Sequence, residues 1–279
     1  MRMKKLFLAL LAVAPMFAAA QVLEVQSMEK INTPANVESK VAGVSPAGDY
    51  LLLTTVANEG LVRYDLATGK TTELSKAQGA GYNVRISRDG KEIAFRETTM
   101  DANRMRRSNI LRQNFASGKR QLIAKGQRDL RKMDVRDADV TVTVMDKKIA
   151  LTRNGQTSLL APCGEDKSYI WPSVSPDGTK LCFYVTTGGC YVSNIDGTNP
   201  QFIAYDCRAA KWYNNNVIVA MADKDDGEKL VSSAIVAYSL DGQKQVLTDP
   251  TMMAVYPYAV EGAVVFSTEK GETYLIKIK

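Results

Sequence analysis

Short runs in which apolar and polar residues alternate recur along the chain, and each follows a polar turn that in most cases contains a glycine. The clearest copy is residues 171–184, WPSVSPDGTKLCFY, where Ser175 to Gly178 form the turn. Alternation over five or six residues indicates a half-buried strand. The apolar residues before the turns are 38 to 49 positions apart, and they are Val44, Ile86, Val135, Val174, Trp212 and Ala259. The pattern therefore predicts a repeat protein made of small sheets.

A second, glycine-centred turn lies later in each repeat. It is centred on Gly69, Gly118, Gly155, Gly197 and Gly242. A period of about 40 to 45 residues with four short strands is typical of a β-propeller. Six turns of the first kind against five of the second mean that the last repeat lacks one strand. We expect residues 22–31 to supply it by pairing with residues 272–279, because closing the ring removes its unpaired edges. The prediction is all-β, with six blades in one domain, residues 21–279.

The first twenty residues have the composition of a cleaved secretory signal. Arg2, Lys4 and Lys5 precede a short apolar segment, and alanines at 18–20 precede Gln21. The apolar segment is shorter than the roughly 20 residues that a spanning helix needs. We expect a periplasmic or secreted protein without a membrane span in the mature chain, and we expect it to be a monomer.

Positive charge is concentrated in one segment. Ten lysines and arginines against a single acid lie between residues 103 and 132. Arg104, Arg106 and Arg107 belong to what reads as a long insertion between two strands of the second blade, and such loops often carry binding. An anionic partner fits this charge, and export argues for a glycan or an envelope protein rather than nucleic acid. Simple solvation of outward-facing strand residues explains the same charges.

Cysteine and histidine usage limits the chemistry. The four cysteines lie in or beside the fourth repeat, and Cys182 with Cys190 is the favoured disulfide because the two flank a tight turn. Free thiols buried between blades are the alternative. The chain has no histidine, which removes Ser-His-Asp and Cys-His catalysis and histidine-ligated metals. No catalytic residue, metal site or cofactor is predicted from the sequence.

Aromatic residues near the first turn of each repeat are the candidates for recognition. In a propeller this segment leads to the mouth of the central channel, where amphipathic rings can form a binding surface. The candidate ligand-binding set is Tyr82, Arg85, Trp171, Tyr213, Tyr256 and Tyr258. Packing between blades is the alternative role, and it is the one expected for Trp212.

The fourth repeat resembles a known family. PSVSPDGTKLCFY followed by YVSNIDGTNPQFI is similar to the repeat of TolB-like propellers, which are WD-repeat-like units of exported bacterial proteins. Pro172, the Ser175 to Gly178 turn, Asp196 and Gly197 match, whereas the third and fifth repeats match poorly. The resemblance implies the propeller fold, an envelope location and the binding of other proteins.

Two functions follow as hypotheses. The preferred one is a non-catalytic platform that binds a protein or glycan in the cell envelope. The alternative is a carbohydrate-active enzyme, a lyase that uses Lys or Tyr as the base on an acidic polysaccharide. Lys or Tyr and Arg side chains that converge in a polar pocket would favour the enzyme, and a shallow aromatic mouth would favour the platform.

Overall fold

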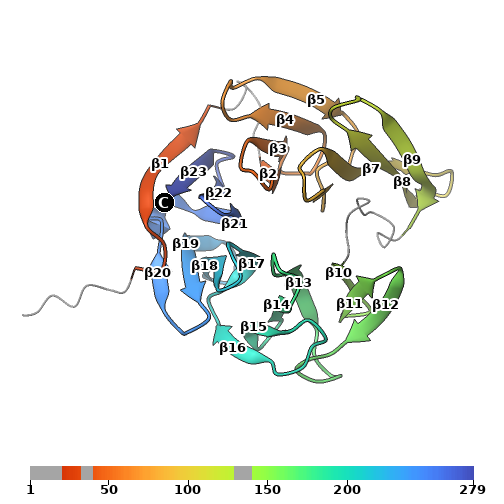
Figure 1. The fold of residues 1–279 in the computed structure, drawn as a ribbon. Coiled ribbons are helices and arrows are strands. Elements are labelled where there is room, and N and C mark those ends of the chain that lie inside the picture. The colour runs from red at the N-terminus through yellow and green to blue at the C-terminus, as the bar shows by residue number, and fades with distance from the viewer. Residues whose placement is uncertain (1–20, 33–39, 129–139) are drawn as a thin grey trace, which may run out of the picture.

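Six small antiparallel sheets surround a central channel in the computed structural model, which describes residues 21–32, 40–128 and 140–279 (Figure 1). The six-bladed propeller predicted from the repeats is thus confirmed. The predicted signal peptide lies outside the described residues. Within them, no helix is long and apolar enough to cross a membrane.

The strands of the first five blades run outward from the channel in sequence order. The first contains β2 (Lys40–Val44), β3 (Tyr50–Thr54), β4 (Leu61–Asp65) and β5 (Thr71–Ser75), and the second contains β6 (Arg85–Ile86), β7 (Glu92–Met100), β8 (Arg106–Asn114) and β9 (Arg120–Gln127). The third has β10 (Val140–Met145), β11 (Lys148–Arg153) and β12 (Gln156–Leu160) among the described residues, and the fourth has β13 (Tyr169–Val174), β14 (Lys180–Val185), β15 (Gly189–Asn194) and β16 (Gln201–Ala204).

The last two blades lie where the chain ends meet. The fifth contains β17 (Arg208–Trp212), β18 (Val217–Asp225), β19 (Leu230–Ser239) and β20 (Lys244–Val246). After a short 3-10 helix, η1 (Pro250–Met252), the sixth contains β21 (Ala254–Val260), β22 (Ala263–Thr268), β23 (Thr273–Ile278) and, at its outer edge, β1 (Val25–Ile31).

In the first, second and fourth blades, the first turn of the repeat is held together by a serine, namely Ser45, Ser87 and Ser175. In the fourth blade, Ser175 Oγ donates to Asp177 Oδ1 (2.6 Å) and accepts from the Lys180 amide (2.9 Å). Gly178 has a φ of 72°, a left-handed conformation that suits glycine. The turn connects β13 to β14, so interactions within a few residues favour a hairpin at this point.

Pairing of β1 with β23 closes the ring. The predicted pairing of the two chain ends is confirmed, and its register runs from Val25 opposite Ile278 to Ile31 opposite Thr273. The segment before β1 reaches the fifth blade, where the Leu23 amide donates to Gln245 Oε1 (2.7 Å) and the Leu23 carbonyl accepts from Gln245 Nε2 (3.1 Å). The N-terminal segment therefore links the fifth blade to the sixth through hydrogen bonds to both.

The apolar core lies between neighbouring blades. Leu23 packs in the cluster between the fifth and sixth blades, with Val219, Ile235, Phe266 and Ile276. Burial of such side chains is the main stabilising contribution to the fold. Trp212 is buried between the fourth and fifth blades, and its indole N–H donates to the Ser173 carbonyl (3.1 Å), so the expected packing role of Trp212 is confirmed.

The basic segment is mostly strand rather than loop. The pairing of β7 with β8 extends to Met100 opposite Arg106, which leaves residues 101–105 as the connection. The expectation of a long insertion loop is therefore wrong, because the inserted residues extend a hairpin. Arg104 and Arg106 are exposed, whereas Arg107 Nε donates to Asp101 Oδ2 (2.8 Å).

Three of the four cysteines share one core cluster. Cys182, Cys190 and Cys207 are fully buried between the fourth and fifth blades, and the Sγ atoms of Cys182 and Cys190 are 3.6 Å apart. All four cysteines are free thiols in the structure. Cys182 lies opposite Val192 and Cys190 opposite Tyr184, so the two cysteines are diagonal neighbours across the hairpin. A bond between them stays a prediction for the oxidised protein.

Asp206 joins the start of the fifth blade to its outer strands. Its carboxylate accepts from the Tyr238 hydroxyl (2.7 Å) and pairs with the Lys244 ammonium. Partial burial alone raises the pKa of Asp206, but the hydrogen bonds from Lys244 and Tyr238 bring this pKa below its ordinary value. The ionised carboxylate is therefore the form that stabilises this connection.

Candidate functional site

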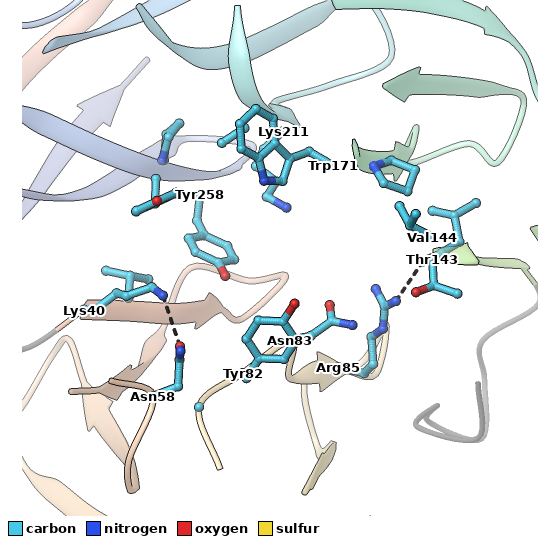
Figure 2. Close-up of a pocket in the computed structure, with 17 residues that line it drawn as sticks. Lys40, Asn58, Tyr82, Asn83, Arg85, Thr143, Val144, Trp171, Lys211 and Tyr258 are labelled. Carbon is cyan, nitrogen blue, oxygen red and sulfur yellow. Dashed lines mark hydrogen bonds between the residues drawn. The ribbon is translucent and has the colours of Figure 1, made fainter. Parts of the chain in front are cut away.

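A cavity of about 470 Å³ occupies the mouth of the central channel (Figure 2). This volume lies in the range of small-molecule sites. Its walls come from the innermost strands of the blades, from the segment before β6 and from the connection between β3 and β4. The lining residues are Lys40, Val41, Asn58, Gly81, Tyr82, Asn83, Arg85, Val142, Thr143, Val144, Trp171, Pro172, Ala209, Lys211, Tyr256, Pro257 and Tyr258.

The charge of the cavity is positive. Three blades each contribute one cationic side chain, namely Lys40 from β2, Arg85 from β6 and Lys211 from β17. Among the described residues that line the cavity, none is an aspartate or a glutamate. Cationic side chains that share a cavity with no carboxylate attract an anion, and the low dielectric constant of the cavity walls strengthens that attraction. The mouth is thus a candidate site for an anionic ligand.

Irregular backbone on the inner strands turns side chains toward the channel. Asn83, Trp171, Ala209 and Tyr256 have φ values between 50° and 55°, and they lie at equivalent positions in four blades. The strand registers shift at three of them, in β13, β17 and β21. Bulges and left-handed residues cost conformational energy and concentrate at functional sites, where they redirect side chains.

In three of these four blades, the side chain two residues beyond the left-handed residue has a polar or charged group that lines the cavity. This position holds Arg85 after Asn83, Lys211 after Ala209 and Tyr258 after Tyr256, whereas Ser173 after Trp171 is not a lining residue. All three residues line the cavity, and Figure 2 shows their side chains around its central space. The repeated left-handed residue therefore brings a guanidinium, an amine and a phenol together from three blades.

Lys211 has an unusual environment for a lysine. Burial by the surrounding protein, together with the positive charge of Arg85, lowers its pKa to about 8. Its Nζ atom lies 5.5 Å from the centre of the Tyr258 ring. Burial raises the pKa of the Tyr258 phenol to about 12, so that group stays protonated. About a tenth of Lys211 is therefore the neutral amine at pH 7.

The other two cations are held in place by neutral groups. Arg85 Nη2 donates to the Val142 carbonyl of β10 (2.9 Å), and Lys40 Nζ donates to Asn58 Oδ1 (3.0 Å). Lys40 also lies over the Tyr256 ring, 5.3 Å from its centre, and burial lowers the pKa of Lys40. Both acceptors are uncharged oxygen atoms, so these two hydrogen bonds do not neutralise either cation.

The Gly81–Tyr82 segment is fixed by close packing. A Cβ atom added at Gly81 would lie 2.1 Å from Thr54 Oγ1, which is too close for any side chain. Behind Tyr82, the Arg96 guanidinium donates to the Tyr82 carbonyl (3.2 Å) and lies 4.6 Å from the centre of the Tyr82 ring. Half of the Tyr82 surface remains exposed at the mouth. The ring is therefore held by its backbone while one face stays accessible.

A second cavity of about 540 Å³ adjoins the first and shares Lys40 and Tyr256 with it. Asp223 lines this cavity, with its side chain 4% exposed, and pairs with Arg208 (2.6 Å). Arg208 in turn lies over the Trp171 ring, 5.6 Å from its centre. The ion pair thus connects the wall of the second cavity to an aromatic ring of the first.

Five of the six aromatic and arginine candidates line the mouth. These are Tyr82, Arg85, Trp171, Tyr256 and Tyr258. Tyr213 does not, because it follows the end of β17 and is buried in the core between the fifth and sixth blades, where its hydroxyl accepts from the Gly262 amide (3.0 Å). Arg104, Arg106 and Arg107 line neither cavity, so the basic hairpin and the mouth are separate features.

Sequence reasoning missed Lys211 and Lys40. Lys211 directly precedes Trp212, just as Arg85 precedes Ile86, so the shared repeat position was a signal that could have identified Lys211. Lys40 lies four residues before Val44, as Tyr82 lies four residues before Ile86. Aligning the six repeats on their turns would have brought out both lysines.

Comparisons with known proteins support the fold. No protein-family model and no curated protein matches the chain. Among solved structures, it is similar to a putative TolB from Agrobacterium tumefaciens, with 17% identity, a TM-score of 0.57, and coverage of 86% of this chain and 90% of that one. It is also similar to TolB from Acinetobacter baumannii, with 12% identity, a TM-score of 0.51, and coverage of 84% and 53%.

A third similar structure is an oligogalacturonate lyase from Vibrio parahaemolyticus. Its identity is 11%, its TM-score is 0.51, and the match covers 84% of this chain and 76% of that one. At such identities the likeness concerns the fold. This chain is therefore a six-bladed propeller structurally similar to TolB-like propellers, as the repeat of the fourth blade indicated.

Proposed function

We propose that this protein binds an acidic saccharide at the mouth of its central channel, in the cell envelope or outside the cell. The observation that carries the proposal is a cavity of about 470 Å³ with three cationic side chains and, among its described lining residues, no carboxylate. Arg85 offers a planar donor group that suits a carboxylate. Tyr82, Trp171 and Tyr256 offer ring faces that suit the apolar C–H faces of a sugar.

Trp171 provides a direct readout of binding. The chain has two tryptophans, and the other, Trp212, is buried and hydrogen-bonded away from the cavity. Titration with oligogalacturonate should change the intrinsic fluorescence, and a neutral oligosaccharide of the same length should not. Trp171→Phe should remove the signal, and Arg85→Gln should raise the Kd roughly tenfold or more because a charge-assisted hydrogen bond is lost.

Binding at the mouth should depend on salt concentration and should not depend on the basic hairpin. Binding should weaken as ionic strength rises, because screening reduces attraction between charges. A variant with Arg104 and Arg106 changed to Ala should bind as well as the unmodified protein. If the hairpin variant loses binding while Arg85→Gln retains it, the site is on the hairpin and the proposal is wrong. Equal binding of neutral and acidic saccharides would contradict it as well.

A second candidate function is supported by one specific observation. Lys211, Tyr258 and Arg85 converge in a polar cavity, which is the arrangement that favours a lyase acting on acidic polysaccharides. Neutral Lys211 would take the proton from the carbon next to the carboxylate, and Arg85 would stabilise the negative charge that develops. The electron pair would form the new double bond as the glycosidic C–O bond breaks, and Tyr258 would protonate the leaving oxygen.

An activity assay separates the two candidates. Incubation with polygalacturonate should be followed by the ultraviolet absorbance of unsaturated ends. Product formed by the unmodified protein and lost in Lys211→Met would establish the lyase. Binding without product would leave the saccharide-binding function alone.

A further inference from the structure

We propose that the amine of Lys211 forms an imine with the aldehyde of a bound acidic saccharide, at the reducing end of the chain in its open form. This inference rests on the proposed function, since it names the part of the ligand that would lie deepest in the cavity. It adds covalent capture to a site that charge alone would make reversible and non-covalent.

The position of Lys211 supports the proposal. It extends from β17 into the cavity, opposite Tyr82 and Asn83 of the second blade (Figure 2). Among the described residues, no carboxylate forms an ion pair with its ammonium, and the nearest ring is that of Tyr258. A surface lysine, by contrast, is surrounded by water. The amine of Lys211 is therefore available to a ligand that enters the channel.

Arg85 gives the ligand an orientation. Its guanidinium is held by the Val142 carbonyl on the side of the cavity formed by the second and third blades. A carboxylate bound there would place the rest of the terminal sugar in the space between Arg85 and Lys211. A sugar acid carries its aldehyde a few carbon atoms from its carboxylate, so one residue can engage both side chains.

The ionisation of Lys211 supplies the reactive form. Four charged or titratable groups around it come from other blades: Arg85 of the second, Tyr258 of the sixth, Cys182 of the fourth and Lys40 of the first. Burial and the charge of Arg85 favour the neutral amine and lower the pKa of Lys211 to about 8. Near pH 7 such an amine is neutral roughly two hundred times more often than an ordinary lysine. Nucleophilic lysines in enzymes are activated in the same way.

The covalent step conserves atoms and electrons. The lone pair of neutral Nζ forms a bond to the aldehyde carbon, and the C=O electron pair moves to oxygen, which takes a proton. A proton then leaves nitrogen, the hydroxyl leaves as water after protonation, and the nitrogen lone pair completes the C=N bond of a protonated imine. Loss of the remaining N–H proton gives the neutral imine. The net reaction converts an amine and an aldehyde into an imine and water, without any oxidant or reductant.

Reductive trapping tests the inference. The protein is incubated near pH 7 with galacturonate oligosaccharide and cyanoborohydride, and the modified lysines are identified by peptide mass spectrometry. Lys211 should be modified roughly tenfold faster or more than the exposed Lys270, because its neutral fraction is larger. Lys211→Arg keeps the charge, and it should lose this modification while Lys270 is still modified slowly.

Two further arms make the outcome decisive. Arg85→Gln should slow modification of Lys211 by the acidic saccharide more than modification by a small neutral aldehyde. The saccharide reduced to its alditol has no aldehyde, so it should still bind but give no adduct. If Lys211 and Lys270 react at the same rate, the imine proposal is refuted while binding of the alditol keeps the proposed function. If neither saccharide binds, both proposals are wrong.

Discussion

Closure of the ring can be tested with one truncation in the N-terminal segment. Leu23 is 5% exposed and packs in the core between the fifth and sixth blades. Replacing a buried leucine with alanine removes apolar contacts and leaves a cavity, which typically costs about 3 to 5 kcal/mol. Leu23 lies near a chain end where the backbone can relax, so we expect Leu23→Ala to lower the free energy of unfolding by about 2 to 4 kcal/mol.

Val25 supplies the matched control. It lies two residues further on, in β1, but its side chain is 39% exposed. Val25→Ala keeps the backbone pairing with Ile278 and should cost less than about 1 kcal/mol. Both variants also keep the two hydrogen bonds to Gln245, since these involve the backbone of Leu23.

The measurement is equilibrium unfolding in urea, followed by circular dichroism. Leu23→Ala should lower the midpoint by roughly 1 M at an unchanged slope, and Val25→Ala should lower it far less. If the two variants differ by less than about 0.5 kcal/mol, the N-terminal segment does not pack in the core and closure by both chain ends is wrong. A change in slope would instead indicate that the segment detaches before the remaining blades unfold.

Three further predictions concern the mouth, acid stability and thiol reactivity. Gly81→Ala should destabilise the protein by about 1 to 3 kcal/mol, because a Cβ atom at this position would collide with Thr54. Gly43→Ala is the control: its Cβ would meet only the mobile end of the Ile86 side chain, at 3.0 Å, so the melting temperature in thermal unfolding should fall less. The folded-state pKa of Asp206 is lowered, so its ionised carboxylate contributes to stability above the unfolded-state pKa, and this contribution is lost as pH falls through the folded-state pKa. In Asp206→Asn, the free energy of unfolding should therefore fall less steeply on acidification. An unchanged dependence of stability on pH would contradict this prediction. Only the partly exposed Cys163 should react with a thiol reagent in the native protein, whereas rapid reaction of more than one thiol would show that the core between the fourth and fifth blades opens.

Much of the architecture could be predicted because its signals are local. The Ser175 to Gly178 turn depends on a side-chain hydrogen bond and one left-handed glycine, both determined within a few residues. Closure could be predicted by counting turns, since a missing strand must be supplied by the other end of the chain. These inferences need no knowledge of how blades pack against one another.

The site could be predicted only in part, because bulges and packing on both blade faces decide which side chains reach the channel. Ala209 interrupts the alternation of β17, so Lys211 lines the cavity. Trp212 and Tyr213 then enter the two cores on either side of the fifth blade. A rule that aromatic residues near the turn face the channel was therefore right for Tyr258 and wrong for Tyr213.

The charge of the second blade shows a different limit. Arg107 and Arg120 pair with Asp101 and Glu97, which lie before the basic segment in the sequence. A window of sequence counts the arginines without their partners across the hairpin. The apparent excess of positive charge is thus partly neutralised by strand pairing.

The pairing of the two chain ends also sets how the molecule should respond to mechanical force. Val25 lies opposite Ile278, so a pull applied through the two termini loads the β1–β23 ladder at one end and breaks its hydrogen bonds one after another. The same pull applied between Ile31 and Ile278 would strain the whole ladder at once. Stretched by its ends in an optical trap, this propeller should peel open at a lower force than it would resist along the strands.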